Sequence, residues 1–125
     1  MFIALSNSDP NPLYEQIEKQ IIEQVVKGKL KAGDILPSIR LLAKELEISV
    51  ITVKKAYENL EYKGFIVTKP GKGSFISEAG EEYVKESKLK KIQEYFEKGI
   101  DECRLLGMKD NEIVSTIKLI LEEKD

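Results

Sequence analysis

The sequence predicts a mainly α-helical fold with one small β-hairpin, an α+β class, and three observations support this prediction. Apolar residues recur at helical spacing in five segments of the chain. Two short β-prone runs flank a Pro-Gly loop. With 125 residues, the chain is long enough for one hydrophobic core and a short extension, but not for two full-sized cores. We therefore expect an N-terminal domain at residues 1–77 and a two-helix extension at residues 78–125.

The first helix is expected to begin at Asn11-Pro12, because Asn is a favoured N-cap and Pro suits the first helical position. Gly28 marks its end. One apolar stripe recurs every four residues between these points: Leu13, Ile17, Ile21 and Val25. Such a stripe is typical of a helix that buries one face.

Two further helices follow, each with a serine that can cap its start. Ser38 precedes a short helix, and Ser49 precedes a third helix that continues to Gly64. Only Glu47-Ile48 separates them, so they are expected to share one core. The candidate core residues are Leu42, Ala43, Leu46, Ile48, Val53, Ala56, Tyr57 and Leu60. Two short helices joined by so tight a link are typical of a helix-turn-helix.

The hairpin comes directly after the third helix. Its strands are predicted at residues 65–68 and 74–76, both rich in β-branched or aromatic residues. The Pro-Gly loop at residues 69–73 connects them as a turn longer than two residues.

The C-terminal region predicts two amphipathic helices. The first is expected to extend from Gly80 to Gly107 and the second to begin at a capping Asp110. Apolar residues of the longer helix form a heptad seam, with Gly99 as either a close helix crossing or a tolerated weak point: Leu89, Ile92, Phe96, Gly99, Cys103 and Leu106. The shorter helix carries its own stripe: Ile113, Val114, Ile117, Ile120 and Leu121.

Two such helices cannot bury both stripes alone. They pack either on the N-terminal domain or against a second copy of the chain, and we favour the second copy. The residues expected at this dimer interface are Leu89, Ile92, Phe96, Cys103, Ile117 and Leu121.

The composition excludes several kinds of catalytic and metal site. The chain has no His and a single Cys, which rules out Ser-His-Asp and Cys-His nucleophile systems and a Cys/His zinc site. Cys103 stands among apolar residues and is interpreted as a small hydrophobe rather than a redox sensor. The carboxylate pairs Glu81-Glu82 and Glu122-Glu123 point in different directions on their helices. We therefore expect no enzyme activity, no metal and no cofactor.

The hydropathy pattern argues against a membrane protein. No apolar run approaches the ~20 residues that span a bilayer, and the N-terminus lacks a signal-peptide pattern. We expect a cytoplasmic protein without a membrane partner.

The charge is unevenly distributed along the chain. The formal net charge is −2, yet residues 1–77 carry 11 Lys and Arg against 9 Asp and Glu. Residues 78–125 carry 9 against 13. Residues 49–72 have 5 Lys against 2 Glu, a local net charge of +3. Phosphate binding depends on this local charge rather than on the total.

The residues at the start of the third helix and in the hairpin loop fit double-stranded DNA. The second helix of a helix-turn-helix enters the major groove, so short polar and basic side chains must point outward near its start. Four residues meet this requirement: Ser49, Thr52, Lys54 and Lys55. The hairpin loop suits a phosphate-binding wing, because glycines allow close approach and lysines neutralise charge: Lys69, Gly71, Lys72 and Gly73.

Several runs of sequence together resemble the DNA-binding domain of the GntR family of bacterial regulators: PLYEQI (12–17), LKAGDILPS (30–38), LPSIRLLAKELEISVITVKKAYENLEYKGFIV (36–67) and KPGKGSFI (69–76). The short two-helix remainder resembles the YtrA subfamily. This resemblance implies a winged helix-turn-helix transcription regulator, usually a repressor, that binds an inverted-repeat operator as a homodimer and often controls a transporter operon. The DNA contacts that it implies are Ser38, Arg40, Ser49, Thr52, Lys54, Gly71 and Lys72.

Three residues depart from the pattern of that family. Val50 stands where an Arg is common, and Ile51 where a polar residue is common. These two residues either contact thymine methyl groups or leave base recognition to Lys54 and the wing. Glu47 stands where Gly is preferred, which costs about 1–2 kcal/mol if that residue adopts a positive φ.

Alternatives stay open at this point. Arg40 either contacts DNA or forms an ion pair with Glu45 or Asp34, and the two lysines of the third helix either bind phosphate or are simply solvated. The acidic total charge and Val50-Ile51 also fit a winged-helix module that binds another protein. A small effector between the C-terminal helices of a dimer is a further hypothesis, without an identity.

Overall fold

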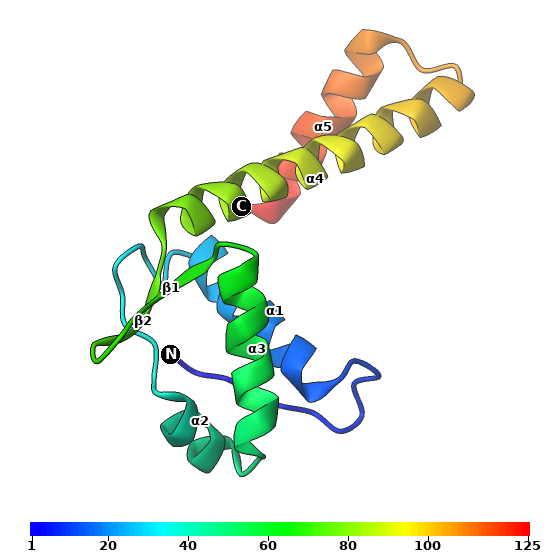
Figure 1. Ribbon diagram of the computed structural model, residues 1–125. Helices are drawn as coiled ribbons and strands as arrows, with labels where there is room; N and C mark the ends of the chain where they lie inside the picture. The colour runs from blue at the N-terminus through cyan, green and yellow to red at the C-terminus, as the bar shows by residue number, and fades with distance from the viewer. The chain divides into compact units, whose positions relative to one another are not determined.

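The computed structural model describes all residues from 1 to 125 and divides into two compact units, Met1–Ser87 and Lys88–Asp125. The expected five helices and one hairpin are confirmed (Figure 1). In chain order the elements are α1 (Leu13–Val26), α2 (Ile39–Leu46), α3 (Val50–Tyr62), β1 (Ile66–Lys69), β2 (Gly73–Ile76), α4 (Glu78–Leu105) and α5 (Asp110–Lys124).

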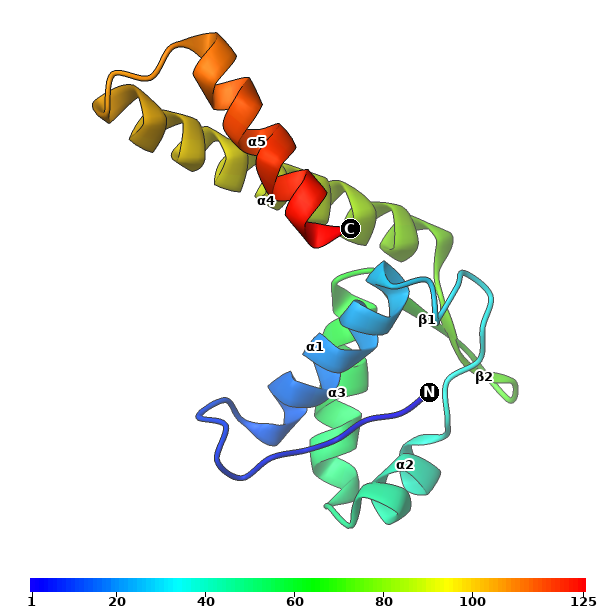
Figure 2. The same ribbon diagram turned by 180° about the vertical axis from the view of Figure 1, so that it is seen from behind.

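Helix α3 is the centre of the first unit. Helices α1 and α2 and strand β1 all pack against it, and α1 and α3 lie side by side in both views (Figures 1 and 2). Their apolar stripes meet in one core, as the helical spacing predicts. The largest fully buried side chains are Ile17, Ile21, Val53, Leu60 and Ile66.

The first strand is shifted by one residue from its predicted range, and the second begins one residue earlier than predicted and ends as predicted. Ile66 pairs with Ile76 and Lys69 with Gly73, so β1 begins after Phe65. Phe65 lies between α3 and β1, where its N–H donates to the Leu60 carbonyl at 2.9 Å and so caps the end of α3.

A third extended segment, which the sequence analysis did not predict, lies along β2. The N–H of Leu36 donates to the Ser74 carbonyl at 2.8 Å, and the N–H of Ile76 donates to the Asp34 carbonyl at 2.9 Å. Ile35 bridges Phe75 between these bonds. The hairpin is therefore attached to the loop that leads into α2.

Three glutamines of α1 hold the N-terminal segment, another feature that the sequence analysis missed. Gln20 exchanges two hydrogen bonds with the backbone of Ala4, at 2.8 and 2.7 Å. Gln16 exchanges two bonds with the backbone of Ser6 in the same way, and the side-chain amide of Gln24 donates one bond to the Phe2 carbonyl. The three glutamines are four residues apart on a helix, a spacing of about 6.0 Å. Their backbone partners are two residues apart on an extended segment, a spacing of about 6.6 Å, so each glutamine faces its partner.

Two predicted helix caps are wrong. The N-cap position of α1 is Pro12 rather than Asn11, and it has no side-chain cap. At α5 the N-cap is Lys109, whose N–H donates to the Glu112 side chain at 3.1 Å. Asp110 is bound instead by the guanidinium of Arg104, which explains why its carboxylate does not cap the helix.

Helix α4 begins at Glu78, before Gly80, because Ser77 caps it: the Ser77 hydroxyl accepts the N–H of Gly80 at 2.8 Å. Its first turns belong to the first unit. A Cβ added to Gly80 would lie 2.4 Å from the Cα of Phe65, so only glycine allows this approach. Val84 is buried in the same core. The compact units consequently divide at 87/88, within α4.

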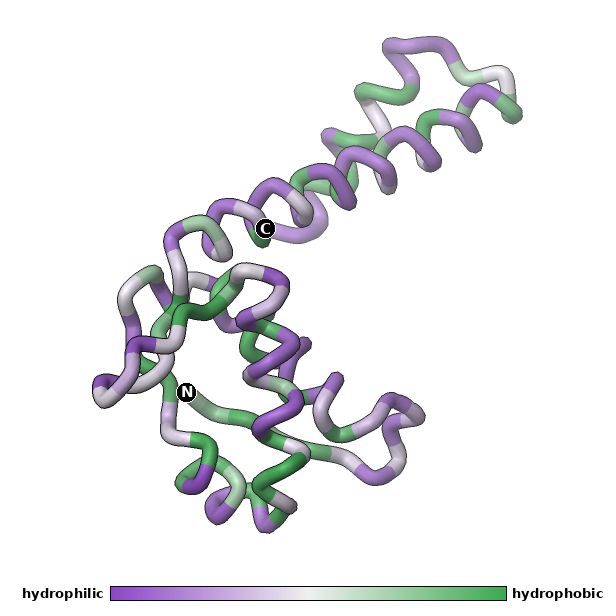
Figure 3. The backbone as a smooth tube through the Cα atoms, viewed as in Figure 1, coloured by the Kyte–Doolittle hydropathy of each residue, from purple (hydrophilic) through white to green (hydrophobic).

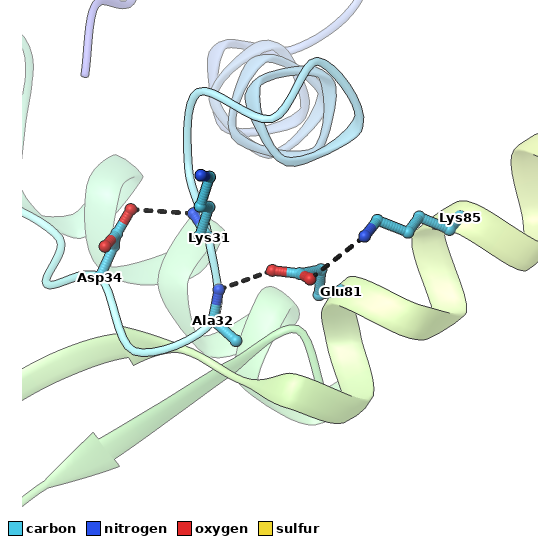
Figure 4. A network of polar contacts seen from close by, with 5 residues as sticks. All are labelled: Lys31, Ala32, Asp34, Glu81 and Lys85. Atoms are coloured by element: carbon cyan, nitrogen blue, oxygen red, sulfur yellow. Dashed lines mark hydrogen bonds and ion pairs between the residues drawn. The ribbon is translucent and has the colours of Figure 1, made fainter.

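Glu81 links α4 to the loop after α1 (Figure 4). Its carboxylate accepts the N–H of Ala32 at 2.7 Å and an N–H of Lys85 at 3.3 Å. The bond from the Ala32 backbone has the larger effect and that from Lys85 the next, and both lower the pKa of Glu81 below its usual value. Asp34 closes the same loop by accepting the N–H of Lys31 at 2.8 Å.

The second unit consists of the remainder of α4 together with α5. Apolar and polar stretches alternate along both helices (Figure 3). Most of the apolar side chains are exposed, including Leu89 at 66% and Phe96 at 58%. Of the stripe predicted for α5, Ile113 is buried, and Cys103 of α4 is half-buried. No helix of the chain is long and apolar enough to cross a membrane.

Candidate nucleic-acid interface

The start of α3 is held by a serine cap, as predicted. The Ser49 hydroxyl accepts the N–H of Thr52 at 3.2 Å, and the two hydroxyl oxygens lie 2.8 Å apart. Both side chains therefore have an internal role, which fixes the conformation of the first turn. Ser49 is exposed and Thr52 half-buried, so both keep hydrogen-bonding capacity for a ligand.

The outer face of α3 is solvent-exposed over its first two turns. Its inner face is buried in the core described above, and the exposed residues are Val50, Ile51, Lys54, Lys55 and Glu58. Lys54 lies 3.8 Å from Glu58, with both side chains largely exposed. Such a surface pair is weak, so it leaves the Lys54 ammonium available. The ammonium of Lys55 lies 4.1 Å from the ring centroid of Tyr14, toward α1.

Helix α2 presents a free cation. The Ser38 hydroxyl caps the helix by accepting the N–H of Leu41 at 3.1 Å, as predicted. Arg40 follows on the exposed surface and takes part in none of the four ion pairs of the chain, so its pairing with Glu45 or Asp34 is absent. An exposed guanidinium without a partner is suited to phosphate or guanine.

Tyr57 fixes the start of α2 against α3. Its hydroxyl donates to the Pro37 carbonyl at 2.7 Å. Burial, and then the charge of Glu45, raise the pKa of Tyr57, so the hydroxyl remains a donor. This contact sets the position of Ser38 and Arg40 relative to the start of α3.

Glu47 occupies the turn between the two helices in a left-handed conformation, with φ 56° and ψ 43°. It is the one residue other than glycine with a positive φ. The predicted cost of about 1–2 kcal/mol therefore applies. The helix-turn-helix retains its geometry because the core on both sides of the turn holds it.

The hairpin loop forms the wing. Gly71 and Gly73 have φ values of 74° and 116°, which other residues rarely adopt, and Lys72 is exposed between them. The Lys69 ammonium lies 5.1 Å from the ring centroid of Phe75. Ile35 supports the loop from below, since a Cβ on Gly73 would lie 3.3 Å from its Cδ1. The β-prone run Ile35-Leu36 was the available sequence signal for this support.

All nine predicted DNA-contacting residues thus lie in the first unit. Helix α2 and the start of α3 lie together at one end of it, and the loop between β1 and β2 projects from its side (Figure 1). No group of three or more Cys, Asp or Glu side chains is arranged to hold a metal. The arrangement provides cations and backbone N–H groups rather than an acid-base pair.

Comparisons with known proteins agree with this geometry. The profile "Bacterial regulatory proteins, gntR family" matches residues 13–76. HTH-type transcriptional repressor YtrA of Bacillus subtilis (strain 168) is 36% identical over 118 residues, covering 94% of this chain and 91% of that protein.

Two solved structures extend the comparison. A transcriptional regulator from Oenococcus oeni has a TM-score of 0.73 and 35% identity, covering 96% of this chain and 99% of that one. YtrA from Sulfolobus acidocaldarius, a GntR-family transcription factor, has a TM-score of 0.57 and 44% identity, covering 60% of this chain and 79% of that one.

Proposed function

We propose that this chain, which belongs to the GntR family of bacterial regulatory proteins, represses transcription by binding an inverted-repeat operator as a homodimer. Members of this family are transcription regulators rather than enzymes. The observation that carries the proposal is the exposed start of α3, with Arg40 unpaired on α2 and Lys72 on the wing. The repressor assignment is supported by the relative named above as a repressor.

Each element has a distinct role in this proposal. The first two turns of α3 enter the major groove, which is ~12 Å wide and accepts a helix. Arg40 and Lys72 neutralise phosphates on either side, and the wing glycines allow the backbone to approach. The residues that we propose contact DNA are Ser38, Arg40, Ser49, Thr52, Lys54, Lys55, Gly71, Lys72 and Gly73.

The homodimer is supported by the exposed apolar stripes of the second unit. Leu89, Ile92 and Phe96 on α4 are exposed, as are Ile117 and Leu121 on α5. Several large apolar side chains exposed on successive helical turns are typical of an interface. A two-fold dimer matches an inverted repeat whose half-sites lie about 10–10.5 bp apart, or a multiple of that distance. Control of a transporter operon follows only from the family resemblance, and a small effector between these helices stays a hypothesis without an identity.

DNA binding is tested by fluorescence anisotropy with the DNA upstream of the chain's own gene and with a shuffled duplex. At about 50 mM salt we expect tight, selective binding that weakens by at least a hundredfold near 200 mM, because phosphate contacts release counterions. Arg40→Ala and Lys72→Ala should each weaken binding and reduce the salt slope. Lys118→Ala, in α5, is the matched control. Equal, salt-insensitive binding of both duplexes would favour the protein-interaction alternative.

Dimerisation is tested by sedimentation at micromolar concentration. We expect a dimer for the native chain and a monomer for Phe96→Asp, because a charge at an apolar contact is costly to bury. Glu97→Ala, next to it on α4, is the control and should remain dimeric. A native monomer, unchanged by Phe96→Asp, contradicts the dimer.

A further inference from the structure

Ile51 is the most exposed apolar residue at the start of α3. Its side chain is 78% exposed, and the neighbouring Val50 is 45% exposed. Neither residue belongs to the core of the unit. The β-branched side chains have few rotamers in a helix, so both present a rigid apolar surface.

A single exposed isoleucine needs no explanation in general, but the surroundings of Ile51 are specific. Lys54 and Lys55 follow one turn later on the same exposed face, so the apolar surface is flanked by positive charge. An apolar side chain flanked by lysines fits a polyanion that carries an apolar group in its groove. It fits an apolar protein surface less well, because the lysines would lose their hydration there.

Two neighbouring exposed residues in the first turn of α3 cannot recognise bases by hydrogen bonds. Val50 and Ile51 have no side-chain donor or acceptor, and the hydroxyls of Ser49 and Thr52 are bonded within the turn. In the major groove the apolar group that distinguishes one base is the C5 methyl of thymine.

We propose that Ile51, with Val50 beside it, contacts thymine methyl groups and makes thymine a specificity determinant of each half-site. This inference rests on the proposed function, since it requires α3 to enter the major groove. Thymine is selected by apolar burial, while Lys54, Arg40 and the wing supply affinity that does not depend on sequence.

The experiment replaces thymine by deoxyuridine, which removes only the methyl group. Duplexes are first selected from a random pool by the full-length chain, and each thymine of the enriched half-site is then replaced in turn. We expect one or two replacements per half-site to weaken binding about fourfold each, the effect of roughly one buried methyl group. With Ile51→Ala, the same replacements should have no effect.

Tyr62→Ala is the matched control, because Tyr62 is exposed on the same face of α3 three turns later. Its sensitivity to deoxyuridine should equal that of the native chain. Circular dichroism verifies that all variants are folded.

The outcomes separate this inference from the proposed function. Selective, salt-dependent binding that tolerates every deoxyuridine overturns the inference alone, and so does sensitivity that persists in Ile51→Ala. A pool in which no sequence is enriched overturns the proposed function and this inference with it.

Discussion

The two units of the chain use apolar residues in opposite ways. In Met1–Ser87, the stripes of α1 and α3 face each other and bury Ile17, Val53 and Leu60 completely. In Lys88–Asp125, the equally regular stripes of α4 and α5 remain largely exposed. Regular spacing therefore predicts which face of a helix is apolar, but not what covers that face.

The difference also separates two sources of stability. The first unit has its own core, so its stability does not require a partner. The second unit exposes most of its apolar side chains, so the proposed homodimer predicts that its stability rises with concentration. Helix α4 takes part in both units, with Val84 buried and Leu89 exposed.

The largest expected effect comes from a pair of leucine truncations, one in each unit. Leu60→Ala removes a fully buried side chain and should destabilise the first unit by about 2–5 kcal/mol, through lost transfer energy and a cavity. Leu89→Ala should change monomer stability by less than about 0.5 kcal/mol. Urea unfolding at two protein concentrations distinguishes them. The Leu60 effect should be independent of concentration, and the Leu89 effect should appear only where dimers form.

The concentration dependence of the Leu89→Ala effect decides whether a second copy covers the second unit. If Leu89→Ala destabilised the chain equally at every concentration, the second unit would be covered from within one chain rather than by a second copy.

A pair of glycines in α4 gives the next largest effect, with opposite signs. Gly80→Ala places a methyl group against the backbone of Phe65 and should destabilise the first unit by about 1–3 kcal/mol. Gly99→Ala meets nothing within 4 Å and should stabilise the helix by about 0.5–1 kcal/mol. Thermal unfolding at low concentration measures both. A destabilising Gly99→Ala under those conditions would contradict the open surroundings of this residue.

The local signals of the sequence were sufficient for most of the fold. Ser38 and Ser49 cap their helices because an N-cap depends only on a residue and the turn that follows it. The positive φ of Glu47 was indicated by the family pattern, which prefers Gly at this turn position. The caps expected at Asn11 and Asp110 are absent because the helices begin at other positions, with Pro12 and Lys109 as the N-cap residues.

Features that depend on distant segments were missed. The glutamines of α1 bind a backbone segment up to 22 residues away, and nothing in their spacing indicates a partner. The strand-like pairing of Leu36 with Ser74 is likewise long-range. For the candidate interface, the residue types and the Ser49 cap were predictable from the sequence. The contact between the Ser49 and Thr52 hydroxyls and that of Lys55 with the ring of Tyr14 required the structure.

The smallest expected effect concerns the junction between α4 and the rest of the first unit. The hydrogen bond from Ala32 lowers the pKa of Glu81, so the folded state favours the carboxylate. A lowered pKa means that this stabilisation is present above the pKa of the unfolded chain and is lost as pH falls through the folded value. The stability of the native chain should therefore decrease on acidification below about pH 4–5, where glutamates titrate. Glu81→Gln keeps an oxygen acceptor for Ala32 but cannot titrate, so its stability should decrease less over the same range.

Glu82→Gln, exposed on the next position of α4, is the control and should follow the native curve. Identical acid curves for all three proteins would show that Glu81 does not couple this junction to pH.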